Sequence, residues 1–188
     1  MAGIPQVPSQ ETEHGLVVVG GGWFVLNARD ARWNFRPGRH GLTFTGESEY
    51  EADTFFPQLG VNLAVLEPGV PNSIYHWETE TEAFLVISGE ALFVVEGEER
   101  PLTQWDFVHC PPKTEHVIVG AGDRPCVVLC MSSRENQQFG PYGEYTANEV
   151  ARLYGASPEQ DVQDADVAGA HLPERGYTRY REGLLPDV

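Results

Sequence analysis

The chain has 188 residues and a formal net charge of −16, with 28 Asp and Glu against 12 Lys and Arg. A surface this acidic repels phosphate backbones and anionic membranes, which argues against nucleic acid and membrane as partners. The 41% hydrophobic content supports a packed core, and the length suits one domain with extensions. No apolar run reaches the roughly 20 residues that a membrane-spanning helix needs.

Two further features bear on the compartment. The first residues, 1–5, lack the basic segment followed by an apolar segment that marks a signal peptide. The three cysteines form no CxxC pair, and their odd number fits free thiols in a reducing cytosol. We therefore expect a cytoplasmic protein.

The N-terminal part of the chain is expected to begin with a flexible segment, residues 1–14, which mixes Pro, Gln, Ser and Glu. The apolar runs 16–19 and 23–26 are predicted to be strands that meet at a glycine bend, residues 20–22. Residues 30–58 carry charged and aromatic side chains and are expected to be irregular with short strands.

From residue 61 onward, short apolar runs alternate with turn residues, which is typical of antiparallel all-β domains. The predicted strands cover residues 61–66, 84–87, 91–95, 100–102, 105–110, 116–119 and 126–131. Glu96 and Gly97 have the composition of a hairpin turn. The pattern predicts an antiparallel β-barrel or jelly roll over residues 15–135.

Residues 136–188 are expected to form an extension with short helices. Residues 146–149 have the pattern of a capping box, with Thr146 at the cap and Glu149 reaching back. The helix that follows should present Val150, Leu153 and Tyr154 on one face, and residues 164–172 are predicted to form a second short helix.

Two imidazoles and two carboxylates near the middle of the chain point to a metal site. His76 and Glu78 alternate along a strand, so their side chains share a face. Glu82 begins the next apolar strand, and His116 comes from a distant strand that a barrel would bring close. These nitrogen and oxygen donors suit one divalent ion of Mn, Fe, Ni, Co or Zn. The alternative is a solvated acidic strand face, with Glu80 also in solvent and His116 an ordinary surface residue.

The first half of this constellation resembles the first motif of the cupin superfamily. That motif reads roughly Gly, five residues, His-x-His, three or four residues, Glu, six residues and Gly. The spacing of His76, Glu78, Glu82 and Gly89 fits it from the first histidine to the last glycine. Glu78 departs from it, because it stands where the second histidine ligand usually sits.

The second half resembles the second cupin motif, roughly Gly, five residues, Pro-x-Gly, two residues, His, three residues and Asn. Pro111 and His116 fit this spacing. Trp105 and Lys113 depart from it because they replace its two glycines, and Gly120 departs because it replaces the asparagine.

The resemblance covers about residues 61–131 and implies a cupin-like barrel with one divalent metal held by His76, Glu78, Glu82 and His116. If Glu78 is not a ligand, it could serve as a general base beside the metal. The resemblance also places Cys110 inside the barrel.

The resemblance further implies a metal-dependent enzyme of dioxygenase, isomerase or lyase type that acts on a small polar molecule. The alternatives are a non-catalytic small-molecule-binding or sensor module, and a structural barrel with a stabilising metal. The runs 16–19 and 23–26 are apolar on both faces of their strands, and an uncovered edge of that kind favours pairing with a second chain. We therefore expect a homodimer.

Overall fold

The computed structural model describes residues 3–19, 22–44, 59–134 and 143–186. The larger of its two main sheets is built from β3 (Trp33–Arg36), β4 (Arg39–Thr43), β5 (Leu59–Leu66), β7 (Glu82–Ser88), β10 (Phe107–Cys110), β12 (Cys126–Ser133) and β14 (Gly176–Thr178). Their order across the sheet is β10-β7-β12-β5-β4-β3-β14, with every neighbouring pair antiparallel.

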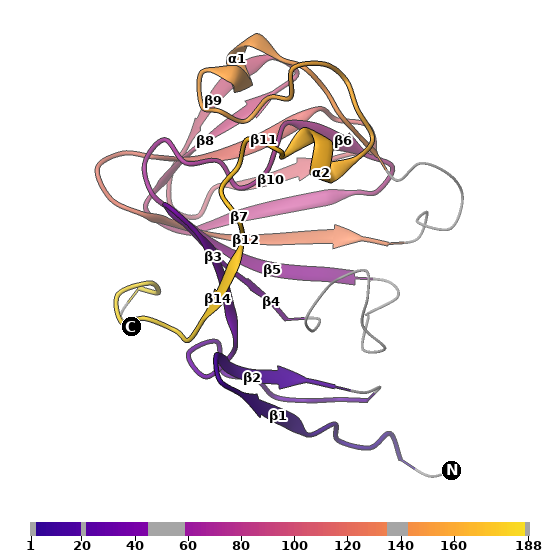
Figure 1. Cartoon of the computed structure of the whole chain (residues 1–188), viewed down its shortest axis with the longest axis vertical. Coiled ribbons are helices and arrows are strands. Elements are labelled where there is room, and N and C mark those ends of the chain that lie inside the picture. Colours follow the sequence, from indigo (N-terminus) through magenta and orange to yellow (C-terminus); the bar gives the residue numbers. More distant parts are fainter. Residues whose placement is uncertain (1–2, 20–21, 45–58, 135–142, 187–188) are drawn as a thin grey trace.

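The smaller sheet is built from β6 (His76–Glu78), β8 (Glu90–Val95), β9 (Glu98–Leu102), β11 (His116–Ala121) and β13 (Gly143–Tyr145), in the order β13-β6-β11-β8-β9. A separate hairpin of β1 (Ser9–Thr12) and β2 (Gly15–Val18) lies at one end of the molecule (Figure 1). The predicted antiparallel all-β fold is confirmed.

The main core lies between the two sheets. Leu66 and Val128 of the larger sheet pack in one cluster with Phe93 and Ile118 of the smaller sheet. Side chains alternate along each strand, so every second residue of these apolar runs enters this core. Burial of side chains of this size stabilises the fold by about 1.5–3 kcal/mol each.

The C-terminal part covers the outer faces of both sheets. Ala151 of α1 (Glu149–Arg152) packs with Val94 and Val117, which alternate with the inner residues of the smaller sheet. Leu184 and Leu185 pack against a cluster that includes Val127, on the outer face of the larger sheet. Within the described range 143–186, this part therefore completes the sheets as well as forming the short helices α1 and α2 (Ala165–Ala168).

The N-terminal part differs from the prediction. Residues 9–12, expected to be flexible, form β1 because they pair with β2 over four positions. The predicted strand at 23–26 is not formed, since Trp23 makes only an isolated bridge with Gln6. Two of the three glycines of the predicted bend, and residues 45–58, fall outside the described residues.

The cap of α1 also differs from the prediction. Asn148, not Thr146, is the N-cap, and its side chain accepts hydrogen bonds from the backbone of Val150 and Ala151. Leu153 does not share the buried face, because it is 77% exposed. None of the helices in the described ranges is long and apolar enough to cross a membrane.

Candidate metal centre

The four side chains predicted as ligands come from three neighbouring places in the fold. His76 and Glu78 lie on β6, and the register partner of His76 is His116, the first residue of β11. Glu82 is the first residue of β7 in the opposite sheet. Folding therefore brings residues 40 positions apart into contact, with the two imidazole centroids 5.1 Å from each other.

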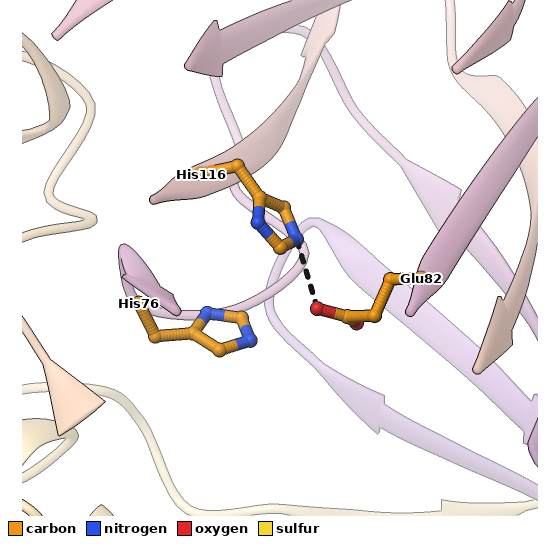
Figure 2. A group of neighbouring side chains, drawn as sticks. All are labelled: His76, Glu82 and His116. Carbon is orange, nitrogen blue, oxygen red and sulfur yellow. Dashed lines mark ion pairs between the residues drawn. The ribbon is translucent and has the colours of Figure 1, made fainter. Parts of the chain in front are cut away.

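Three of the four side chains converge on one point. Figure 2 shows His76, Glu82 and His116 turned toward each other, with His116 Nε2 3.2 Å from Glu82 Oε2. One ligand atom from each of the three lies within 4.8 Å of the other two. Ligand bonds of about 2.1 Å place the donor atoms of one ion roughly 3–4 Å apart, so a small side-chain rotation would suffice to hold a metal.

Glu78 lies at the edge of this group. Its Oε1 is 3.5 Å from His76 Nε2, which confirms that the two side chains share a face. Its Oε2 is shielded from solvent and has no hydrogen-bond partner among the described residues. A buried carboxylate oxygen without a partner is costly, so it is the natural place for a cation, a substrate hydroxyl or a proton.

The backbone fixes the orientation of both imidazoles. His76 Nδ1 lies 2.7 Å from the carbonyl oxygen of Ile74, and His116 Nδ1 lies 2.9 Å from that of Thr114. A carbonyl only accepts hydrogen bonds, so both Nδ1 atoms carry the proton and both Nε2 atoms face the carboxylates. Two lone pairs then oppose each other at 3.2 Å between His116 and Glu82, unless a proton or a cation lies between them. A hydrogen bond from Nδ1–H to a backbone carbonyl is a common way in which proteins orient metal-binding histidines.

The electrostatics of the two imidazoles differ. Burial lowers the pKa of His76, but the hydrogen bond to Glu78 and the charges of Glu82 and Glu78 outweigh it and raise the pKa above 6.5. Burial and the neighbouring His76 lower the pKa of His116 below 6.5. The two carboxylates therefore favour a positive charge at this group of side chains.

Two aromatic rings lie against the imidazole of His116. The rings of Phe84 and Phe93 have centroids 5.3 and 5.7 Å from the imidazole. Both belong to the main core, and His116 itself is only 2% exposed. An apolar wall of this kind strengthens the interaction of the donors with a cation.

Sequence reasoning missed Tyr145 at this site. It is the register partner of His76 on β13, and its ring centroid lies 5.6 Å from the imidazole. Burial raises the pKa of Tyr145, and the charges of Glu78 and Glu82 add to this effect. Only strand pairing places Tyr145 beside His76, and no spacing in the sequence indicates it.

Glu80 is a correction to the prediction of a solvated residue. It is only 2% exposed and accepts a hydrogen bond of 2.6 Å from Ser133 Oγ. The same hydroxyl accepts a hydrogen bond from the backbone of Thr81. Glu80 is thus not one of the side chains that converge with His76, and its bond to Ser133 fixes the turn between β6 and β7, which carry three of the predicted ligands.

The two non-glycine residues at the glycine positions of the second motif keep a left-handed backbone. Trp105 has φ of 76° and Lys113 has φ of 71°. The Lys113 N–H donates to the carbonyl oxygen of Glu78 at 2.7 Å, so this turn holds the strand that carries Glu78. At position 120, a Cβ would lie 2.3 Å from the Glu67 carbonyl oxygen, which explains the glycine there.

Cys110, Cys126 and Cys130 are buried in the main core, and none of them forms a disulfide within the described residues. The expected inward position of Cys110 is therefore confirmed, and burial raises the pKa of its thiol to about 12. A thiol that stays protonated in this way is a core residue rather than a nucleophile.

The chain is similar to several known proteins. Residues 62–132 match the family described as the cupin domain. A search of curated proteins gave no match. A cupin-like protein from Thermotoga maritima is 20% identical, with a TM-score of 0.50 over 68% of this chain and 90% of that one.

Two further solved structures are similar at lower TM-scores. A sugar phosphate isomerase of the cupin superfamily from Silicibacter pomeroyi is 26% identical, with a TM-score of 0.46 over 58% of this chain and 64% of that one. A DMSP lyase from Ruegeria pomeroyi is 23% identical, with a TM-score of 0.42 over 50% and 46%. The match thus spans less than two thirds of each of these two enzymes.

The antiparallel fold, the cupin-domain match over residues 62–132 and the Thermotoga fold all agree with the resemblance of the two motifs. This chain is therefore a cupin-like protein.

Proposed function

We propose that this protein is a divalent-metal-dependent enzyme that acts on a small polar molecule, with the metal held by His76, Glu82 and His116. The observation that carries the proposal is the pair of histidines whose Nδ1 atoms lie against backbone carbonyls. This leaves two Nε2 lone pairs and a carboxylate at one buried point. Without a cation, that arrangement places acceptor atoms against acceptor atoms.

Three protein donors leave coordination positions open for a substrate or water. A bound Mn, Fe, Ni, Co or Zn ion would supply Lewis acidity, and with a redox-active ion a site for O₂. The protein would orient the substrate with side chains around the ligand group. Dioxygenase, isomerase and lyase reactions on a polar substrate all use such a site.

Two residues beside the ligands are proposed to handle protons. Glu78 would be either a fourth ligand or a general base, since its unpartnered Oε2 is buried at the site. Tyr145 would remain protonated and donate a hydrogen bond to a substrate oxygen, because its pKa is raised. The three cysteines, which form no disulfide within the described residues, support a cytoplasmic location as part of the same proposal.

Metal analysis of the purified protein tests the site. We expect about one divalent ion per chain, and strong loss of metal in His76→Ala and His116→Ala. His109→Ala is the matched control, because His109 lies on the exposed side of β10. Full metal content in both ligand variants would refute the site.

Glu78→Gln separates the two roles of Glu78. As a ligand, its replacement lowers metal affinity together with turnover. As a base, the replacement leaves metal content unchanged and lowers turnover alone.

A screen of small hydroxy acids, phenols and sugars with the metal-loaded protein tests for catalysis. Turnover that stops without O₂ indicates a dioxygenase, and turnover unaffected by O₂ indicates an isomerase or lyase. Substrate binding without turnover would refute the enzyme and favour a binding module.

A further inference from the structure

Three arginines lie side by side at one edge of the larger sheet. Arg36 and Arg39 are register partners on β3 and β4. Arg175 comes immediately before Gly176, which pairs with Phe35, so strand pairing brings Arg175 alongside Arg36. Figure 1 shows β14, β3 and β4 as neighbours at this edge. We call Arg36, Arg39 and Arg175 the arginine row.

The row lies on the inner side of the sheet edge. Arg39 is the register partner of Leu66, whose side chain lies in the core between the sheets. Register partners project to the same side of a sheet, so Arg39 and Arg36 project toward this inner side. Arg36 and Arg39 are both partly buried, which brings their charges into a medium of lower dielectric than water.

The contacts of the row within the described residues contain no carboxylate. Arg39 donates from Nε and Nη2 to Asn72 Oδ1 at 3.3 and 3.2 Å, and from Nη1 to Asn34 Oδ1 at 3.2 Å. These acceptors are neutral amides. Arg36 Nε is shielded from solvent and has no hydrogen-bond partner among the described residues. Within the same ranges, none of the three arginines forms an ion pair.

A row of arginines without an ion pair to a carboxylate is unexpected in a chain this acidic. Like charges directly opposite each other on neighbouring strands destabilise a sheet. The chain has 28 acidic residues and 12 Lys and Arg, so a carboxylate would be the expected neighbour of any arginine. Burial and, to a smaller extent, the charges of Arg36 and Arg175 lower the pKa of Arg39 to about 10, against an opposing effect of Cys130. Glu67 Oε2 would lie 3.5 Å from a Cβ on Gly38, in the turn between Arg36 and Arg39, but no ion pair joins it to the row among the described residues. The positive charges of the row therefore favour a bound anion.

We propose that the arginine row binds the phosphate group of a small molecule. A phosphate carries nearly two negative charges at neutral pH, and its three oxygens accept the paired N–H groups of guanidinium forks. Asn72 and Asn34 hold the fork of Arg39 in place before binding. The row lies on β3, on β4 and just before β14, whereas His76, Glu82 and His116 lie on β6, β7 and β11, so this site does not depend on the proposed metal centre.

Calorimetric titration with inorganic phosphate tests the proposal. We expect one site per chain in the wild type, and binding at least about tenfold weaker in Arg36→Gln, because charge-assisted hydrogen bonds are lost. Arg100→Gln is the matched control, since Arg100 is an exposed residue on β9 and pairs with Glu98. It removes one positive charge elsewhere and should bind phosphate like the wild type. No binding in the wild type, or equal binding in Arg36→Gln, would overturn the proposal.

Thermal unfolding separates binding from a structural role. Without phosphate, Arg36→Gln should melt at or above the wild-type temperature, because a repulsion is removed. With saturating phosphate it should melt below the wild type. A lower melting temperature in both conditions by the same amount would show that Arg36 is only structural and would overturn the proposal.

Two further sets of titrations identify the ligand and test whether the site is independent of the metal centre. Glycerol phosphate binding more tightly than inorganic phosphate identifies a phosphomonoester ligand, and the reverse order identifies free phosphate. Acetate binding as tightly as phosphate would contradict a phosphate site. His116→Ala, which should lose the metal, is expected to keep phosphate binding, so the two sites can fail separately.

Discussion

Lys113 provides a quantitative test of the turn that supports the metal centre. Its backbone is left-handed, with φ of 71°, at a position where the cupin pattern has glycine. A side chain in this conformation costs about 1–2 kcal/mol because Cβ approaches the backbone. The Lys113 side chain is exposed, and it forms no hydrogen bond or ion pair with another of the described residues. Lys113→Gly should therefore relieve strain without removing a contact.

The expected gain in the free energy of unfolding is smaller than the strain energy that the substitution relieves. Glycine has more freedom in the unfolded chain, which offsets about 0.4–1 kcal/mol of the gain. We expect a net stabilisation of about 0.5–1 kcal/mol and a rise in melting temperature of roughly 1–4 °C for a chain of this length. The metal content should not change, because the backbone N–H that donates to Glu78 is retained.

Urea unfolding of three proteins checks this reasoning. Lys113→Ala is the control, because it removes the long side chain but keeps Cβ and the strain. The free energy of unfolding should rank Lys113→Gly above both Lys113→Ala and the wild type. If Lys113→Gly is the least stable of the three, the left-handed turn is not strained and the argument fails.

The remaining predictions concern packing, metal and assembly. Gly120→Ala should lower the free energy of unfolding by about 2–4 kcal/mol in urea titration, because its Cβ would lie 2.3 Å from a backbone oxygen; Gly3→Ala, with nothing within 4 Å, should match the wild type. Removal of metal by a chelator should lower the melting temperature of the wild type but not of His116→Ala, since a ligand at 100 times its Kd stabilises by about 2.7 kcal/mol. Light scattering should give a dimer, about twice 20.8 kDa, because apolar residues such as Trp23 are exposed at the N-terminal end; a monomer mass, or a dimer that survives deletion of residues 1–27, would reject this interface.

The strands that carry the site could be predicted from the sequence, because one face of each strand lies in the core and the other is less buried. Alternation of apolar and polar residues shows which side of a strand enters the core, and turn residues mark where strands end. His76, Glu82 and His116 also stand at motif spacings, so the convergence of these three was predictable in outline.

Local patterns failed where a distant contact decides the outcome. Glu80 sits in a run of alternating Glu and Thr that looks solvated, yet Ser133 from β12 holds it inside. Thr146 has the chemistry of a cap, but its backbone N–H donates to Tyr75 across the fold and the side chain of Asn148 takes the role. In both cases a contact with a distant part of the chain decides the outcome, and the local sequence pattern does not indicate that contact.

The same limit explains why the phosphate site had no signal in the sequence. The period of two along a strand fixes the face of each side chain but not its lateral neighbour, which depends on strand order and register. Arg36 and Arg39 flank a tight turn, but Arg175 joins them only because the C-terminal strand returns to the sheet edge beside β3. The spacing of His76 and Glu82 is visible in the sequence because β6 and β7 follow each other closely in the chain. The arginine row, in contrast, forms only once the C-terminal strand has paired with β3.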